Sequence, residues 1–131
     1  MCGRFALIAP GPVLAEQFGL LEVPPMAPRY NIAPSQDIPI VRDTESGPEM
    51  TLARWGLIPS WSKEPKTGYS TINARVETVA EKPAYRAPFK RQRCLIPADG
   101  FYEWKMVNGK KTPHHICMRD SRVFAFAGLW D

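Results

Sequence analysis

Short runs in which hydrophobic and polar positions alternate dominate this chain, and a period of two is typical of half-buried β-strands. Asn108-Gly109 separates two such runs, and an Asn-Gly pair in that position predicts a tight hairpin turn. A second turn is expected at Thr44–Pro48. The strands expected from the pattern are Arg4–Ile8, Asp37–Arg42, Glu49–Trp55, Cys94–Ile96, Phe101–Met106, Lys111–Met118 and Val123–Trp130.

Helical segments are expected to be few and short. Pro12 is well placed to open a helix that runs through Phe18, and Gly19 is a suitable C-terminal stop. The proline-rich stretch Leu21–Arg29 is interpreted as a connector, and Thr71–Arg75 as irregular chain. Further helical turns are expected at Val76–Lys82 and Ala84–Gln92. Together these elements predict an α+β fold that is rich in strands.

Composition indicates one compact domain. The chain has 131 residues, 44% of them hydrophobic and 23% charged, which is typical of a globular protein. Its 14 prolines are about twice the average usage, which favours turns over long helices. No apolar run approaches the roughly 18 residues that a membrane span needs. We therefore expect a single domain over residues 1–131 and no membrane association.

Positive charge is concentrated in the second half of the chain. Residues 1–62 carry four Lys/Arg against six Asp/Glu, whereas residues 63–131 carry thirteen against seven. Five basic residues follow one another in the sequence with no acidic residue until Asp99, and Tyr85 and Phe89 lie between them. These basic residues are Lys82, Arg86, Lys90, Arg91 and Arg93. The stretch predicts contact with a polyanion, with the aromatic rings as stacking partners, or else an ordinary solvated helix face.

The three cysteines, Cys2, Cys94 and Cys117, are widely spaced and odd in number. No pair has the close spacing of a metal knuckle, so we expect neither a metal site nor a cofactor. Reduced thiols fit a cytoplasmic protein, associated with the nucleoid if bacterial, or a nuclear one if eukaryotic.

Cys2 is the residue with the most informative chemistry. Removal of Met1 would leave a thiol and a free α-amine on neighbouring carbons, and both have nucleophilic forms near neutral pH. Such a pair condenses with an aldehyde through the amine and then closes through sulfur to a thiazolidine ring. The alternative is that cysteine at this position is incidental and the methionine stays.

Five sequence blocks place this cysteine in a wider pattern. The blocks are MCGRF at Met1–Phe5, RYNIAPSQ at Arg29–Gln36, WGLIPSW at Trp55–Trp61, INARVET at Ile72–Thr78 and RCLIPADGFYEW at Arg93–Trp104. In this order they closely resemble the abasic-site processing family, also called the SOS response-associated peptidase family. The resemblance runs along essentially the whole chain. It implies a curved or bifurcated mixed sheet with short peripheral helices.

The resemblance also implies a catalytic set. In the family, the mature N-terminal cysteine, here Cys2, forms a thiazolidine with the ring-opened sugar of an abasic site. The asparagine of INAR, here Asn73, orients the amine and the sugar, and the glutamate of FYEW, here Glu103, transfers protons. These residue types suit the roles, because an amide positions without adding charge and a carboxylate can carry a proton. Their ordinary alternatives are a helix-capping Asn73 and an exposed strand residue at Glu103.

The same resemblance implies single-stranded DNA containing abasic sites as the partner. Arg4 and Arg75 would hold the phosphates that flank the lesion, since a guanidinium matches a phosphate in geometry. Trp61, with Pro34, would contact the bases, because an aromatic face stacks on any base. Trp55 is expected in the core instead. We expect a monomer.

The chain departs from the family pattern in one respect. Further along the chain, the family has an H-x-R-M-P-like segment, and the histidine of that segment assists sugar ring opening. That segment is absent here, so the chain is expected to be a C-terminally truncated form. His114 and His115 lie in no catalytic motif, and we expect them on opposite faces of a strand, in structural roles.

Two other function classes remain open. Amidohydrolases with an N-terminal nucleophile also begin Met-Cys-Gly, but they lack the INARVET and FYEW blocks and usually continue with an apolar residue where this chain has Arg4. A non-covalent nucleic-acid binding module would use the basic stretch and the tryptophans, and would leave Cys2 unused.

Overall fold

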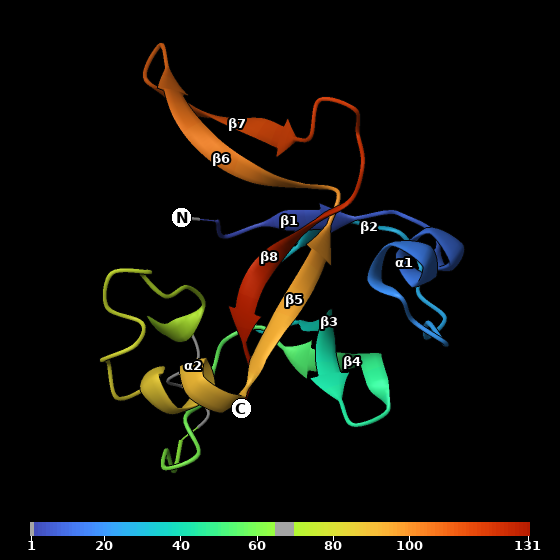
Figure 1. The fold of residues 1–131 in the computed structure, drawn as a ribbon. Coiled ribbons are helices and arrows are strands. Elements are labelled where there is room, and N and C mark those ends of the chain that lie inside the picture. Colours follow the sequence, from blue (N-terminus) through green and yellow to red (C-terminus); the bar gives the residue numbers. More distant parts are fainter. Residues whose placement is uncertain (1, 65–69) are drawn as a thin grey trace.

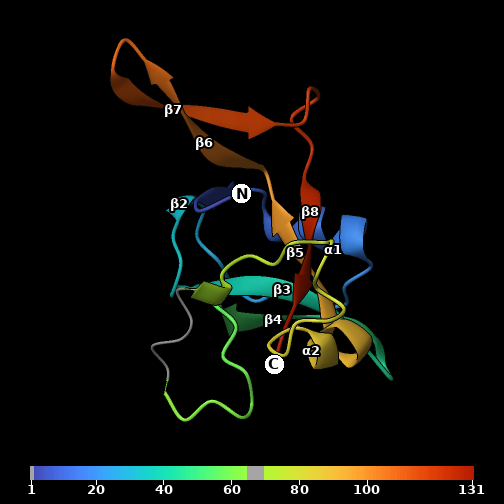
Figure 2. The same cartoon turned by 90° about the vertical axis from the view of Figure 1, so that its left-hand side faces the viewer.

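The computed structural model describes residues 2–64 and 70–131, which form two four-stranded antiparallel sheets with short helices at the periphery (Figures 1 and 2). One sheet has the order β2-β1-β6-β7 and the other β4-β3-β5-β8. The strands are β1 (Phe5–Leu7), β2 (Arg29–Ile32), β3 (Asp37–Thr44), β4 (Gly47–Arg54), β5 (Arg93–Ala98), β6 (Gly100–Val107), β7 (Lys110–Cys117) and β8 (Phe124–Leu129). The helices are α1 (Gly11–Phe18) and α2 (Arg86–Arg91). The predicted strand-rich α+β class is confirmed.

Strand β1 lies at the centre of the first sheet and is buried along its whole length. Phe5 pairs with Ile32 of β2 on one side and with Phe101 of β6 on the other. Because β1 pairs with β6, the residues just before β1 also run beside β6. This pairing carries the N-terminal segment into the body of the protein.

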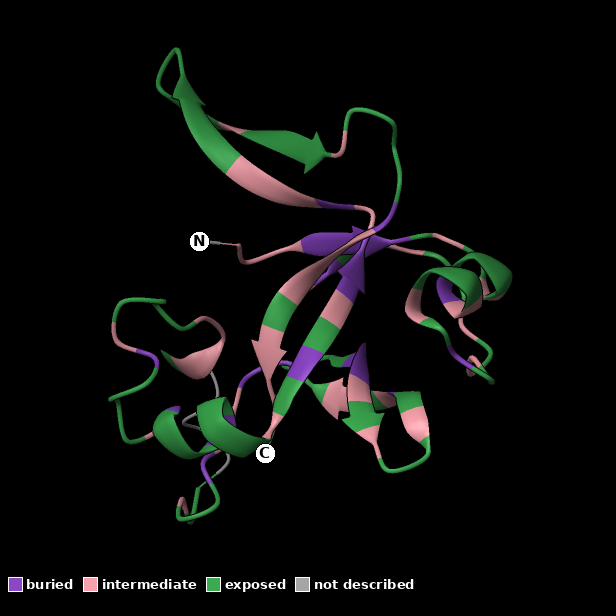
Figure 3. Ribbon diagram, viewed as in Figure 1, coloured by how far each residue is buried: buried purple, intermediate pink, exposed green. Residues whose placement is uncertain are grey.

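The β3–β4 and β6–β7 hairpins turn where the sequence predicted turns. In β6–β7, Asn108 and Gly109 have φ angles of 50° and 76°, and two successive positive values are what a two-residue hairpin turn requires. The register runs from Val107↔Lys110 to Gly100↔Cys117. This hairpin extends away from the rest of the molecule, and most of its residues are exposed (Figure 3).

An aromatic cluster joins the two sheets. The ring of Phe5 meets Trp55 edge-on at 5.3 Å between centroids and Phe126 at 6.0 Å. Phe101 of the first sheet contacts Phe126 of the second at 5.7 Å. Edge-to-face pairs at these separations are favourable beyond the area they bury. Trp55 is only 9% exposed, which confirms its expected place in the core.

Helix α1 ends as predicted. Gly19 adopts a left-handed conformation with φ of 65°, and proline occupies the first turn. Leu14 is fully buried and anchors the helix to the core. No helix within the described residues is long and apolar enough to cross a membrane.

Residues 76–82 form turns, as expected, and the N–H of Lys82 donates to the carbonyl of Thr78 at 3.0 Å. These turns do not extend into a regular helix, because Pro83 disfavours helical conformation at Lys82 and the run contains three β-branched residues. Two expectations differ from the structure. Helix α2 covers only part of the segment expected from Ala84 to Gln92. Residues 29–32 form β2, although the expected connector extended to Arg29, since β2 exists through its pairing with β1.

The sheet type also needs correction. All pairings between the described strands are antiparallel, whereas the family resemblance implied a mixed sheet. Strands β3–β4 and β6–β7 are joined by tight turns, and tight turns join only antiparallel neighbours.

Candidate functional site

Cys2 lies half-buried in the segment that precedes β1. Its thiol donates a hydrogen bond to the backbone carbonyl of Arg4 at 3.2 Å. Burial raises the pKa of the Cys2 thiol, and the negative charge of Glu103 adds to the increase. At neutral pH this cysteine is therefore held mainly as the neutral thiol.

Asn73 contacts Cys2 directly. Its side-chain amide nitrogen donates to the backbone carbonyl of Cys2 at 2.7 Å, across 71 positions of sequence. Asn73 itself lies in irregular chain, as expected for Thr71–Arg75. No strand register holds this segment, so other contacts must fix the amide in place.

Two aromatic side chains provide those contacts. The indole N–H of Trp55 donates to the carbonyl of Ile72 at 2.9 Å, and the hydroxyl of Tyr85 donates to the carbonyl of Asn73 at 3.1 Å. Tyr85 is 8% exposed, so it is not the base-stacking residue that the sequence suggested. Burial raises the pKa of the Tyr85 hydroxyl, which keeps it a protonated donor. Spacing alone gave no signal for this supporting role, which depends on a contact made only in the fold.

Glu103 approaches Cys2 from β6. The pairing of β1 with β6 continues past Phe5, because the backbone N–H of Tyr102 donates to the carbonyl of Arg4 at 3.0 Å. Glu103 is the next residue of β6, is half-buried, and acts electrostatically on the Cys2 thiol. The fold thus brings together the three residues predicted to be catalytic.

The residues predicted to bind DNA are more scattered. Arg4 is half-buried, and its Nη1 donates to Oδ1 of Asn31 at 3.3 Å. Arg75 is exposed, two positions after Asn73. Trp61 is 66% exposed in the loop after β4. Pro34 is half-buried in the loop between β2 and β3, which is tied to Trp55 by a hydrogen bond from the N–H of Ser35 at 2.8 Å.

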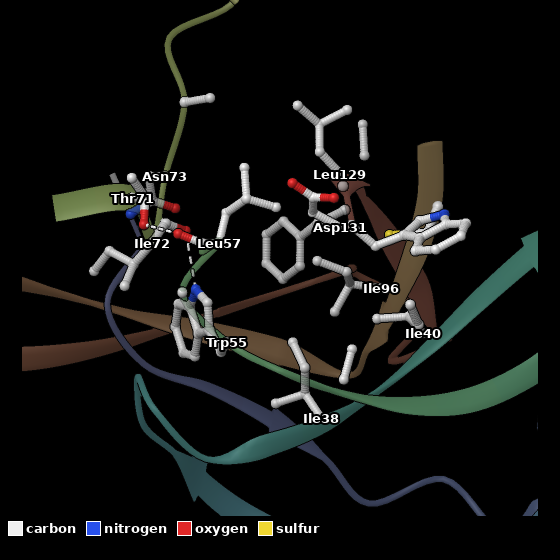
Figure 4. A pocket seen from close by; sticks show the side chains of 18 of the residues that line it. Ile38, Ile40, Trp55, Leu57, Thr71, Ile72, Asn73, Ile96, Leu129 and Asp131 are labelled. Carbon is white, nitrogen blue, oxygen red and sulfur yellow. Dashed lines mark hydrogen bonds between the residues drawn. The ribbon is translucent and has the colours of Figure 1, made fainter. Parts of the chain in front are cut away.

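An open cavity of about 890 Å³ lies beside this site (Figure 4). Cys2 and Asn73 contribute to its lining, together with Trp55 and apolar side chains from β3, β4, β5 and β8. Ile38, Ile40 and Ile96 point into it in the close view. Arg42, Arg54 and Arg93 also contribute to the lining, so positive charge lies among the apolar side chains.

The basic stretch lies on the surface around α2. Its five Lys and Arg residues are exposed, while Phe89 is 39% exposed. Lys90 and Arg91 occupy the last turn of α2, where positive charge interacts favourably with the helix dipole. The position is compatible with both interpretations, a polyanion contact and a solvated helix face.

The two histidines occupy opposite faces of β7, as expected. His115 packs against the Tyr102 ring, with centroids 5.1 Å apart, and its ring also fills the space beside Gly100. His114 lies directly opposite Glu103 in the β6–β7 register. Within residues 2–64 and 70–131, no three potential ligands gather into a metal site.

Comparison with known proteins places this arrangement in a family. The sequence profile of the SOS response associated peptidase (SRAP) family matches residues 1–131. The abasic site processing proteins YoqW and YoaM of Bacillus subtilis are each 47% identical over 135 residues, covering 100% of this chain and 60% of the relative. The chain thus spans about three-fifths of the length of these curated relatives.

Solved structures agree with the sequence comparison. A crystal structure of a protein from Bacteroides thetaiotaomicron superposes with a TM-score of 0.84 and 26% identity, covering 98% of this chain and 61% of that one. The five sequence blocks, the full-length profile match and the shared fold all agree. The chain belongs to the SOS response associated peptidase family.

Proposed function

We propose that this protein captures abasic sites in single-stranded DNA as a covalent thiazolidine on Cys2. The names of its relatives support abasic-site processing, and one contact carries the assignment to this chain. That contact is the 2.7 Å hydrogen bond from the Asn73 amide to the Cys2 carbonyl, which fixes the N-terminal residue next to Glu103.

The reaction begins when Met1 is removed and the α-amine of Cys2 becomes free. The amine adds to the aldehyde of the ring-opened sugar to give a carbinolamine, which loses water to give a Schiff base. The sulfur then bonds to the imine carbon, and the nitrogen gains a proton. One aldehyde and one aminothiol thus give one thiazolidine and one water, with no oxidant or cofactor.

Glu103 is proposed to move the protons. As the acid it supplies the proton that lets the carbinolamine hydroxyl leave as water, and as the carboxylate it accepts the proton of the thiol. The raised pKa of the Cys2 thiol makes the second step important, because little thiolate is present at neutral pH. A carboxylate beside the sulfur can accept the thiol proton as the carbon–sulfur bond forms, so the reaction does not need thiolate that is already present.

Asn73 is proposed to aim the nucleophile. Its amide donates to the Cys2 carbonyl, which limits rotation of the N-terminal residue. A neutral amide does this without changing the charge around the amine. Holding reacting groups in a productive geometry can contribute several kcal/mol to a rate.

The DNA is proposed to contact residues around this centre. Arg4 and Arg75 bind phosphates, while Trp61 and Pro34 contact the bases. Support comes from the exposure of Arg75 and Trp61 and from the forked donors of arginine. The protein is proposed to act as a monomer without a metal or cofactor, in the compartment that holds the DNA.

A peptidase-type activity is proposed for the same centre. Exposure of the Cys2 amine requires cleavage of the bond that follows Met1. In this step the Cys2 sulfur attacks the Met1 carbonyl, and the acyl group moves from the Cys2 nitrogen to the sulfur. Water then hydrolyses the thioester, which releases methionine and restores the thiol beside the free amine.

The test mixes the chain with a single-stranded oligonucleotide that contains one abasic site and separates the products on a denaturing gel. Intact mass first establishes that Met1 has been removed. The controls are undamaged oligonucleotide and Cys2→Ala. A heat-stable band that requires both the lesion and Cys2 supports capture.

The opposite result favours a different function. Salt-sensitive binding that ignores the lesion and survives Cys2→Ala would exclude capture and support a non-covalent binding module. The exposed basic residues around α2 are the observation that favours this second candidate. Replacing Lys90 and Arg91 would then reduce the dependence of binding on salt.

A further inference from the structure

The β6–β7 ladder places an unassigned histidine beside the proposed proton carrier. Glu103 of β6 pairs directly with His114 of β7. Directly opposite residues of an antiparallel pair project to the same face, with their Cβ atoms about 4.5–5.5 Å apart. The neighbouring pair, Tyr102↔His115, projects to the other face. The register thus separates two adjacent histidines, and only His114 shares the face of Glu103.

The surroundings of Glu103 make this neighbour significant. The Cys2 thiol interacts with it electrostatically, and His114 lies opposite it on β7. Lys105 lies two positions along β6 on the same face, toward the hairpin turn. Glu103 is half-buried while His114 is exposed. The imidazole therefore has room to rotate toward the carboxylate and remains in contact with solvent.

We propose that His114 is a positioning residue that hydrogen-bonds the Glu103 carboxylate and keeps it directed at Cys2. The inference rests on the proposed function of the site. In the proposed reaction Glu103 gives a proton to the leaving hydroxyl and then takes one from the thiol, so its carboxylate alternates between two states. An imidazole N–H stabilises the charged state and exchanges its proton with solvent between steps. Imidazole suits this task because its charge changes between about pH 5 and 8.

The first measurement is the rate of abasic-site capture between about pH 5.5 and 8.5, the range that spans imidazole titration. The variants are His114→Gln, Glu103→Gln and the double variant, with His115→Gln as the matched control. His114→Gln is expected to slow capture about tenfold at neutral pH, the size of one lost hydrogen bond to a charged group. It should also flatten the pH profile, while His115→Gln keeps the wild-type profile. In the Glu103→Gln background, loss of His114 should have no further effect, because His114 acts through Glu103.

The second measurement needs no DNA. The NMR signals of both imidazole rings are followed against pH in the wild-type chain and in Glu103→Gln. Loss of the carboxylate is expected to change the chemical shifts of the His114 ring and to leave those of the His115 ring in place.

The outcomes separate the two proposals. If the wild-type chain captures nothing, the proposed function fails, and the NMR titration still decides whether His114 and Glu103 are coupled. If capture proceeds but His114→Gln leaves both its rate and its pH profile unchanged, the positioning role is wrong and the function stands. Equal shifts of both histidine signals in Glu103→Gln would also overturn the role.

Discussion

Glu103 and Asn73 reach the same cysteine from two regions that are held in different ways. Glu103 belongs to β6, whose backbone is paired with β1 on one side and with β7 on the other. Asn73 belongs to irregular chain that is held by single hydrogen bonds from Trp55 and Tyr85. A strand distributes its constraint over a continuous ladder of bonds, whereas the Asn73 segment is held by separate hydrogen bonds, which also include those between Leu57 and Thr71. The two regions should therefore respond differently to single substitutions.

The largest effect is expected from Trp55→Ala. This change removes both a buried aromatic side chain and the hydrogen bond to Ile72, so it should cost about 3–5 kcal/mol of unfolding free energy. Chemical denaturation measures this cost. Trp61→Ala is the matched control, because Trp61 is 66% exposed, and a change within about 0.5 kcal/mol is expected there. Equal losses in the two variants would contradict the assignment of Trp55 as the anchor.

On the strand side, Gly100→Ala should be the damaging change. An added methyl group would meet the His115 ring and the backbone carbonyl of Ile116. Overpacking of this kind costs about 1–3 kcal/mol. Gly3→Ala is the control, since a Cβ built at Gly3 meets nothing within 4 Å. Thermal unfolding of both variants checks the difference, and a fully stable Gly100→Ala would show that the hairpin adjusts freely.

Tyr85→Phe should separate the two regions most clearly. It deletes one hydrogen bond, to the Asn73 carbonyl, at a cost of about 1 kcal/mol. Amide hydrogen exchange is expected to accelerate around residues 71–75 and to stay unchanged in β6. Tyr30→Phe provides the comparison, because Tyr30 is 65% exposed. Uniform acceleration in both regions would mean that they open together.

The smallest effect concerns the reactivity of Cys2. Glu103 contributes to the raised pKa of the Cys2 thiol, so Glu103→Gln should lower that pKa, increase the thiolate fraction and speed alkylation at a given pH. Burial, the larger of the two causes that raise the pKa, remains in this variant. Iodoacetamide labelling followed by mass spectrometry measures the rate against pH. Glu49→Gln, on β4, should leave the rate unchanged.

Much of the secondary structure could be predicted because its signals are local. Alternation located the long strands to within a few residues, Asn108-Gly109 located the β6–β7 turn, and Gly19 located the end of α1. The missed strand β2 is short, only Ile32 of its residues is buried, and it forms by pairing with β1. Helical turns were expected at Val76–Lys82, and the β-branched residues and Pro83 prevent these turns from extending into a helix.

The candidate site could be predicted only in part. Cys2, Asn73 and Glu103 were selected from sequence blocks, and the fold brings all three together. The anchoring contacts of Trp55 and Tyr85 were not predicted. Trp55 was assigned only to the core, and Tyr85 was interpreted as a stacking partner. Their hydrogen bonds go to backbone carbonyls, which every residue has, so no pattern of side chains in the sequence predicts these bonds.

The sequence by itself determined the chemistry available to this protein and the points where the chain turns. A cysteine at position 2, a turn dipeptide and a helix stop act through bonds and neighbours within a few residues. The tertiary structure alone decided which groups surround the thiol. The contact between Asn73 and Cys2 spans 71 positions, and the pairing of Glu103 with His114 depends on the hairpin register. A register shift of one residue would turn every side chain of the strand to the other face, so only the assembled sheet determines what Cys2 meets.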